Sequence, residues 1–291
     1  MKRTKVLFDS NVWQQVVCPD DYTNDKDSEI FLELNKMISE SVIYPYISEA
    51  IFTLEAINKD IKKKGNLWEQ LTRSSFIKKY NPIINTEELT YSNNGDLYIS
   101  FNVEVNPDLS AHPGNNTYHN KYIGKARSIN FKILRCPRIG MFVNRDLLDG
   151  DFASFNNTIE ERFGEIGRRI EDRGCGKRWI EEIGEKYSQP IYQKVYTNNK
   201  EPWNVGIRRA PDSEDKNIDA AFAEWADGDM VSASYAYCMD YICTRDNANN
   251  AGEKSILSNS HREWLKKEYN VNIVSPKELL NIIQEQVPRN Q

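Results

Sequence analysis

Four acidic residues in this chain stand where a short apolar run meets a predicted helix. They are Asp9, Glu49, Asp229 and Asp246. The first of them follows Lys5-Val6-Leu7-Phe8, a run with the composition of a buried strand. In an open parallel sheet, ligands gather outside the carboxyl ends of the strands, so acids that are distant in sequence can meet in one cleft. We therefore expect these four carboxylates to lie close together.

Strand and helix patterns alternate at both ends of the chain. Residues 4–8 and 42–46 have strand patterns, and each is followed by a predicted helix, residues 27–39 among them. The same order returns from Ile218 onward, where we expect one helix to break at 227–229 and a second to follow. Such alternation is typical of parallel α/β architecture. We predict an α/β fold with a central parallel sheet flanked by helices.

The middle of the chain has a different texture. Residues 89–105 alternate around Asn93-Asn94-Gly95-Asp96 and predict a β-hairpin, whereas residues 157–187 have a helical composition. We therefore predict a discontinuous core formed by residues 1–61 and 216–291, with residues 62–215 as a large inserted or accessory α+β region. One continuous large domain remains the alternative.

Four clustered carboxylates would require a cation. Without one, like charges a few ångströms apart raise each other's pKa and do not all ionise together. Mg²⁺ or Mn²⁺ fits an all-oxygen set of ligands. We expect one of these ions as the cofactor.

Composition and charge narrow the class of protein. The 291 residues are 39% hydrophobic, carry a formal net charge of −5 and contain no apolar run that approaches the length of a membrane span. The five cysteines form no Cys-x-x-Cys pair, which argues against a thiolate zinc site. Because Met1-Lys2-Arg3-Thr4 leads into a strand and not into a signal peptide, we expect a cytoplasmic protein without a membrane partner.

These motifs together resemble the PIN domain, a metal-dependent nuclease fold. The resemblance is carried by Leu7-Phe8-Asp9-Ser10-Asn11, Ile47-Ser48-Glu49, the small-residue helix after Asp229, and Cys243-Thr244-Arg245-Asp246, and it covers about half of the chain. It implies an endonuclease that hydrolyses phosphodiester bonds, usually in RNA. It also implies that the four acids form a catalytic metal site, with Asn11, Thr244 and Asp227 in support. Because Mg²⁺ commonly keeps several waters, we expect Asp9 and Asp246 to hold the ion directly. Glu49 and Asp229 then complete its shell through waters or position the attacking water.

A basic stretch in the middle region is a candidate surface for the nucleic acid. Residues 121–140 contain six basic residues and no acid, with Tyr122 and Phe131 between them as rings that could stack on bases. The predicted substrate-binding residues are Lys121, Lys125, Arg127, Lys132 and Arg135. RNA is the expected partner, and single-stranded DNA remains open.

Other interpretations remain. Each acid on its own can be explained as a helix cap or a turn residue. An aspartate-based phosphotransferase usually needs a second aspartate at position 11, where this chain has Asn. A dinucleotide-binding enzyme is disfavoured because no Gly-x-Gly-x-x-Gly follows the first strand. A catalytically inactive PIN-like scaffold or nucleic-acid-binding module is the main alternative. The sequence also leaves open a homo-oligomer, an inhibitor protein, and a role as toxin, defence factor or RNA-processing enzyme.

Overall fold

A five-stranded parallel sheet forms the centre of the protein. The computed structural model describes residues 3–52, 83–91, 97–104, 117–136, 152–190, 203–248 and 252–286. The strand order in the sheet is β5-β2-β1-β6-β7, and every pairing is parallel. The strands are β1 (Thr4–Phe8), β2 (Ile43–Ser48), β5 (Lys132–Leu134), β6 (Tyr241–Cys243) and β7 (Ile273–Val274). The predicted parallel α/β architecture is confirmed at this level.

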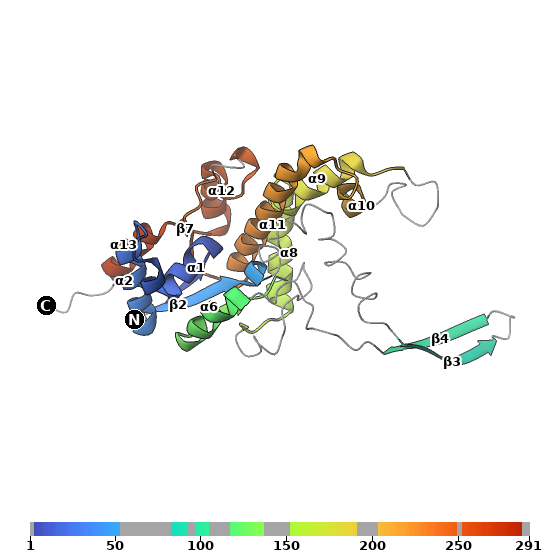
Figure 1. Ribbon diagram of the computed structural model, residues 1–291, viewed down its shortest axis with the longest axis horizontal. Helices are drawn as coiled ribbons and strands as arrows, with labels where there is room; N and C mark the ends of the chain where they lie inside the picture. The colour runs from blue at the N-terminus through green and yellow to red at the C-terminus, as the bar shows by residue number, and fades with distance from the viewer. Residues whose placement is uncertain are drawn as a thin grey trace.

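Helices cover both faces of the sheet because side chains alternate along each strand. Val6 and Phe8 of β1 belong to one apolar cluster, and Leu7 between them belongs to the other. The first face is covered by α1 (Ser10–Val17), α2 (Ser28–Ser39), α6 (Thr117–Ser128) and α13 (Pro276–Gln286). The second is covered by α8 (Asn157–Glu171), α9 (Lys177–Tyr187), α11 (Asp215–Ala236) and α12 (Asn259–Tyr269), and Figure 1 shows α8 beside α11.

Side-chain caps fix several helix starts. The Asn156 side chain accepts a hydrogen bond from the backbone N–H of Ile159 at 3.0 Å and so begins α8. At α13, the Ser275 backbone N–H donates to the Glu278 carboxylate at 2.8 Å, and the Glu278 N–H donates to the Ser275 hydroxyl at 3.3 Å. This reciprocal pair is a capping box, as the sequence predicts.

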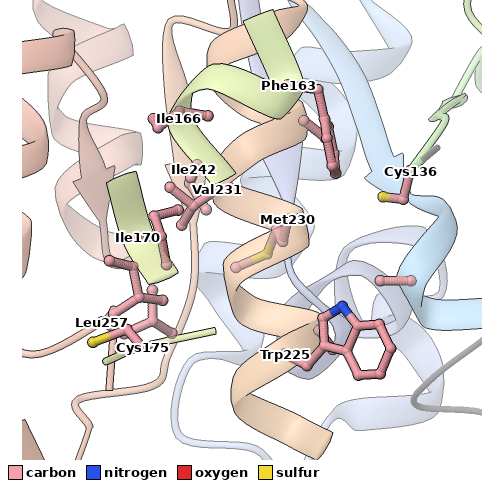
Figure 2. Packing of buried hydrophobic residues seen from close by; sticks show 14 of the residues in the cluster. Cys136, Phe163, Ile166, Ile170, Cys175, Trp225, Met230, Val231, Ile242 and Leu257 are labelled. Atoms are coloured by element: carbon pink, nitrogen blue, oxygen red, sulfur yellow. The ribbon is translucent and has the colours of Figure 1, made fainter. Parts of the chain in front are cut away.

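Helix α11 is continuous, and the predicted break at Asp227-Gly228-Asp229 is wrong. Gly228 lies against the turn between α8 and α9, where a Cβ atom would come within 2.9 Å of the Gly176 Cα. The glycine therefore permits close packing of two backbones and does not end the helix. Figure 2 shows the packed face, with Met230 of α11 near Phe163 of α8.

Part of the middle region completes the central sheet. Residues 83–91 and 97–104 form the predicted antiparallel hairpin, β3 (Ile83–Tyr91) and β4 (Leu97–Glu104). In contrast, β5 pairs with β2 in the main sheet. The division of the chain into a core and an inserted region stays a prediction, but its boundary at residue 62 does not separate the sheet from the middle region.

Several shorter elements join these parts, and some predicted ones fall elsewhere. The sequence patterns also predict a helix at 47–61, a loop at 106–120 and a strand at 139–143. The strand and most of the helix lie outside the described residues, while α6 begins inside the stretch predicted as a loop. None of the helices in the described ranges combines the length and apolar character needed to span a bilayer. The shorter elements are η1 (Pro19–Tyr22), η2 (Glu49–Phe52), α10 (Trp203–Ile207), η4 (Asp212–Glu214) and η5 (Gly252–Lys254).

Candidate functional site

Asp9 lies at the point where the strand order of the sheet reverses. The chain runs from β1 to β2 on one side and returns as β6 on the other, and Asp9 directly follows β1. Crevices at such switch points, beyond the carboxyl ends of the strands, are where α/β sheets bind ligands. Only 3% of Asp9 is exposed, and its carboxylate accepts hydrogen bonds from the Ser10 N–H and the Thr244 hydroxyl, both at 2.6 Å.

A polar network joins the ends of β1 and β6 around this carboxylate. The Thr244 hydroxyl, which donates to Asp9, accepts from the Asn11 amide at 3.3 Å and from the Asp246 backbone N–H at 2.9 Å. Asn11 in turn accepts from the backbone N–H of Arg245 at 3.0 Å. Two of the three predicted supporting residues, Asn11 and Thr244, thus hold the loop of Asp246 next to Asp9.

The electrostatics of this pair favour a positive charge. Burial raises the pKa of Asp9, the two hydrogen bonds lower it, and the negative charge of Asp246 raises it again. Asp246 is partly exposed, and its carboxylate accepts a hydrogen bond from the Ala248 N–H at 2.7 Å. A cation between the two carboxylates would offset both the desolvation and the repulsion.

Glu49 and Asp229 form a second acidic group around Cys136. Glu49 follows β2, is 1% exposed and accepts a hydrogen bond from the Cys136 backbone N–H at 2.9 Å. Asp229, also 1% exposed, lies on α11, and its backbone carbonyl is 4.0 Å from the Cys136 sulfur. Burial raises the pKa of the Cys136 thiol well above its usual value, and the charges of Asp229 and Glu49 add to that shift.

The donor set fits Mg²⁺ or Mn²⁺ through two carboxylates. In the described part of the chain, no group of three or more His, Cys, Asp or Glu side chains lies close enough together to hold one ion. Mg²⁺ is commonly bound by one or two carboxylates and keeps several waters. Asp9 and Asp246 supply such a pair of hard oxygen ligands, so the fit does not require direct contact with all four acids.

The predicted basic residues differ in their surroundings. Lys125, Arg127 and Lys132 are exposed on α6 and β5, whereas the side chain of Lys121 lies outside the described residues. Arg135 is partly buried, with its guanidinium 4.8 Å from the centre of the Phe152 ring and its backbone N–H donating to the Tyr237 hydroxyl at 3.3 Å. Arg135 is therefore in part a packing residue.

The two aromatic residues of the basic stretch are not free to stack on bases. Tyr122 is 5% exposed and packs against Trp13, with ring centroids 6.1 Å apart. Phe131 is 3% exposed and packs against Phe8 at 5.7 Å. The interpretation of these rings as base platforms is wrong, because both belong to the core between α6 and the sheet.

Two charged residues near Asp246 were missed by the sequence patterns. Glu224 on α11 is 2% exposed, and its carboxylate accepts from the backbone N–H groups of Gly176 and Ile256 at 3.1 and 2.7 Å. Burial raises the pKa of Glu224 to about 7, and the charge of Asp246 acts in the same direction. Its place as the one acid within the apolar run from Ala220 to Ala226 was the available signal. The other residue, Arg262 on α12, had no such signal.

Comparisons with known proteins add no relative. No protein-family model matches the chain, and searches of curated proteins and of solved structures find no significant match. The resemblance to the PIN domain therefore stays a prediction. The functional argument depends on the residues of the site.

Proposed function

We propose that this chain is a PIN-like, Mg²⁺- or Mn²⁺-dependent endonuclease that hydrolyses phosphodiester bonds in RNA in the cytoplasm. The observation that carries the proposal is the pair formed by buried Asp9 and partly exposed Asp246, joined through Thr244 at the switch point of the sheet. A buried carboxylate with a raised pKa beside a second carboxylate is typical of functional sites.

The residues of the site have separate roles in this proposal. Asp9 and Asp246 hold the ion, while Thr244 and Asn11 keep the two carboxylates in position through their hydrogen bonds. With an ion held by these two residues, the site would have the means to lower the pKa of a water molecule and to neutralise charge on the phosphate. Glu49 and Asp229 act through water molecules, and Asp227 supports the site from the same helix. Groups that contact the ligand residues without touching the ion orient those ligands and tune a metal site.

The choice of RNA as substrate depends on the basic surface and on the resemblance. Lys125 and Arg127 on α6 and Lys132 on β5 give a chain of net negative charge an exposed positive segment. Contacts from such residues to phosphates supply affinity without reading sequence. Single-stranded DNA carries the same phosphates, so the experiment below includes it.

A nucleic-acid-binding module without catalysis is the second candidate. It is favoured by the structural roles of two buried acids. Asp9 caps the start of α1, and Glu49 accepts a hydrogen bond from the Cys136 backbone N–H. It is also favoured by the lack of a three-ligand group within the described ranges. Such a module would bind RNA but would have no Mn²⁺ site. A ligand that binds the folded state raises the melting temperature, so Mn²⁺ would leave the melting temperature of this module unchanged.

The test is a cleavage panel with the purified full-length chain. RNA, single-stranded DNA and duplex DNA are each incubated with Mg²⁺ or Mn²⁺ and then with excess chelator. We expect internal cleavage of RNA that requires the metal and stops with chelator. RNA binding without cleavage under any metal condition would support the inactive module instead.

A further inference from the structure

Arg262 is fixed at the edge of the site by two backbone carbonyls. It lies in the first turn of α12, where its Nε–H donates to the Leu257 carbonyl at 2.7 Å and one of its terminal N–H groups donates to the carbonyl of Asp246. These carbonyls lie near the two ends of the segment that connects β6 to α12. The guanidinium therefore has a defined orientation next to the loop that carries Asp246.

Several carboxylates act on this guanidinium through their charge, and none of the ion pairs among the described residues includes it. Burial lowers the pKa of Arg262, and four carboxylates oppose that shift through their negative charge: Asp246, Glu278, Asp227 and Asp9. In the part of the chain that the structure describes, Arg262 makes no ion pair within 4 Å with any of them. A guanidinium has five N–H groups, and among the described residues three of the five in Arg262 make no hydrogen bond.

We infer that Arg262 binds a phosphate of the nucleic acid at the acidic site. Its two backbone contacts orient the planar group, and the unused N–H groups provide the forked donor set that phosphate oxygens accept. The residue is partly exposed, so the ligand can reach it. This inference rests on the proposed nuclease function and extends it, because it assigns a positive contact for the substrate inside a group of negative charges.

A direct alternative is that Arg262 only holds the Asp246 loop. The two roles predict opposite effects on metal binding. If Arg262 only positions Asp246, replacing it disturbs the metal ligands and weakens Mn²⁺ binding. If its charge faces the site and contacts phosphate, replacing it removes a repulsion from the cation while it removes an attraction for the substrate.

The experiment compares Arg262→Gln and Arg262→Lys with Lys267→Gln, an exposed position on the same helix that gives the same charge change as Arg262→Gln. Three quantities are measured in the full-length chain: kcat/KM for RNA with Mn²⁺, the rise in melting temperature with Mn²⁺, and the salt dependence of RNA binding with chelator. We expect Arg262→Gln to lower kcat/KM about 10- to 100-fold and to reduce the slope of log K against log salt by about 0.7.

The same variant should keep or increase the stabilisation by Mn²⁺, Arg262→Lys should recover part of the activity, and Lys267→Gln should match the wild-type chain. Unchanged cleavage and salt slope in Arg262→Gln, or loss of its stabilisation by Mn²⁺, would overturn the inference. If the wild-type chain itself neither cleaves RNA nor responds to Mn²⁺, the proposed nuclease function fails first, and the two failures are thus distinct.

Discussion

Asp9 and Glu49 both follow neighbouring parallel strands and are both buried, yet different groups hold their carboxylates. The Thr244 hydroxyl and the Ser10 backbone N–H donate to the Asp9 carboxylate, and partly exposed Asp246 lies beside it. Glu49 accepts from the backbone of Cys136, which is itself buried with Asp229. We call these the Asp9 group and the Glu49 group.

The difference shows where a hydrated cation can enter. Mg²⁺ keeps several waters when it binds proteins, so its site needs contact with solvent. The Asp9 group has that contact through Asp246, whereas every member of the Glu49 group is at most 1% exposed. The two groups follow equivalent strands, but only the Asp9 group has the surroundings of an accessible ion site.

The largest expected effect separates direct from indirect ligands. Asp9→Asn and Asp246→Asn should each lower metal-dependent cleavage by more than the roughly 10–100-fold that is typical of outer-shell partners. Glu49→Gln and Asp229→Asn should fall within that range. Cleavage rates at saturating Mn²⁺ check this order, and circular dichroism controls for folding. Full activity in Asp9→Asn and Asp246→Asn would remove the proposed active site.

The basic residues of α6 and β5 should affect RNA binding and should leave Mn²⁺ binding by the acidic groups unchanged. Changing Lys121, Lys125, Arg127 and Lys132 together to Gln should weaken RNA binding and reduce its salt slope by up to about 3, since each phosphate contact contributes about 0.7. The stabilisation by Mn²⁺ should stay unchanged. Fluorescence anisotropy at several salt concentrations measures the slope. The matched control changes four exposed lysines elsewhere, Lys216, Lys266, Lys267 and Lys277, to Gln. Equal slopes in the two variants would exclude the basic stretch as the binding surface.

The position of Asp229 depends on the close packing of α11. Gly228→Ala would place a Cβ atom 2.9 Å from the Gly176 Cα, so α11 must shift, and we expect a loss of about 1–3 kcal/mol in the free energy of unfolding. Gly164→Ala on α8 is the control, because the nearest atom to its Cβ is 3.8 Å away in a flexible side chain. It should stabilise the chain by up to about 1 kcal/mol. Chemical denaturation measures both free energies of unfolding, and similar values would argue against the close approach of Gly228 to Gly176.

The last prediction concerns the pH dependence of Glu224, on which the charge of Asp246 acts. Its folded pKa of about 7 lies above the ordinary value of 4.5. Its stabilising contribution is therefore complete below pH 4.5 and is lost as the pH rises through 7. Glu224→Gln keeps an acceptor for Gly176 and Ile256, so it should gain up to about 3 kcal/mol over the wild-type chain between pH 5 and pH 8. Denaturation with chelator at both pH values tests this, and a constant difference would contradict the raised pKa.

Local patterns in the sequence predicted much of the sheet and part of the site. The supporting role of Thr244 beside the acids was an implication of the resemblance to the PIN domain. The apolar run Lys5 to Phe8 predicted the strand β1, and the alternation of strand and helix patterns predicted the parallel sheet. These two predictions depend on short stretches whose periodicity and capping residues carry the information. The capping box at Ser275 succeeded for the same reason.

The errors have one physical cause, which is packing between distant segments. The low helix propensity of glycine favours a helix break at Gly228, but this residue packs against Gly176 in the turn between α8 and α9. The basic neighbours of Tyr122 favour a ring that stacks on bases, but this ring packs against Trp13. Arg262 was missed because its partners are backbone carbonyls, which any residue supplies. Tertiary contacts of this kind leave no local signal.

The most direct test of the central claim is a crystal structure with Mn²⁺ and its anomalous scattering. The account predicts a peak between the carboxylates of Asp9 and Asp246 in the wild-type chain, and its loss in Asp9→Asn. A Mn²⁺ ion bound at the Glu49 group or on a distant surface, with the space between Asp9 and Asp246 holding none, would contradict it.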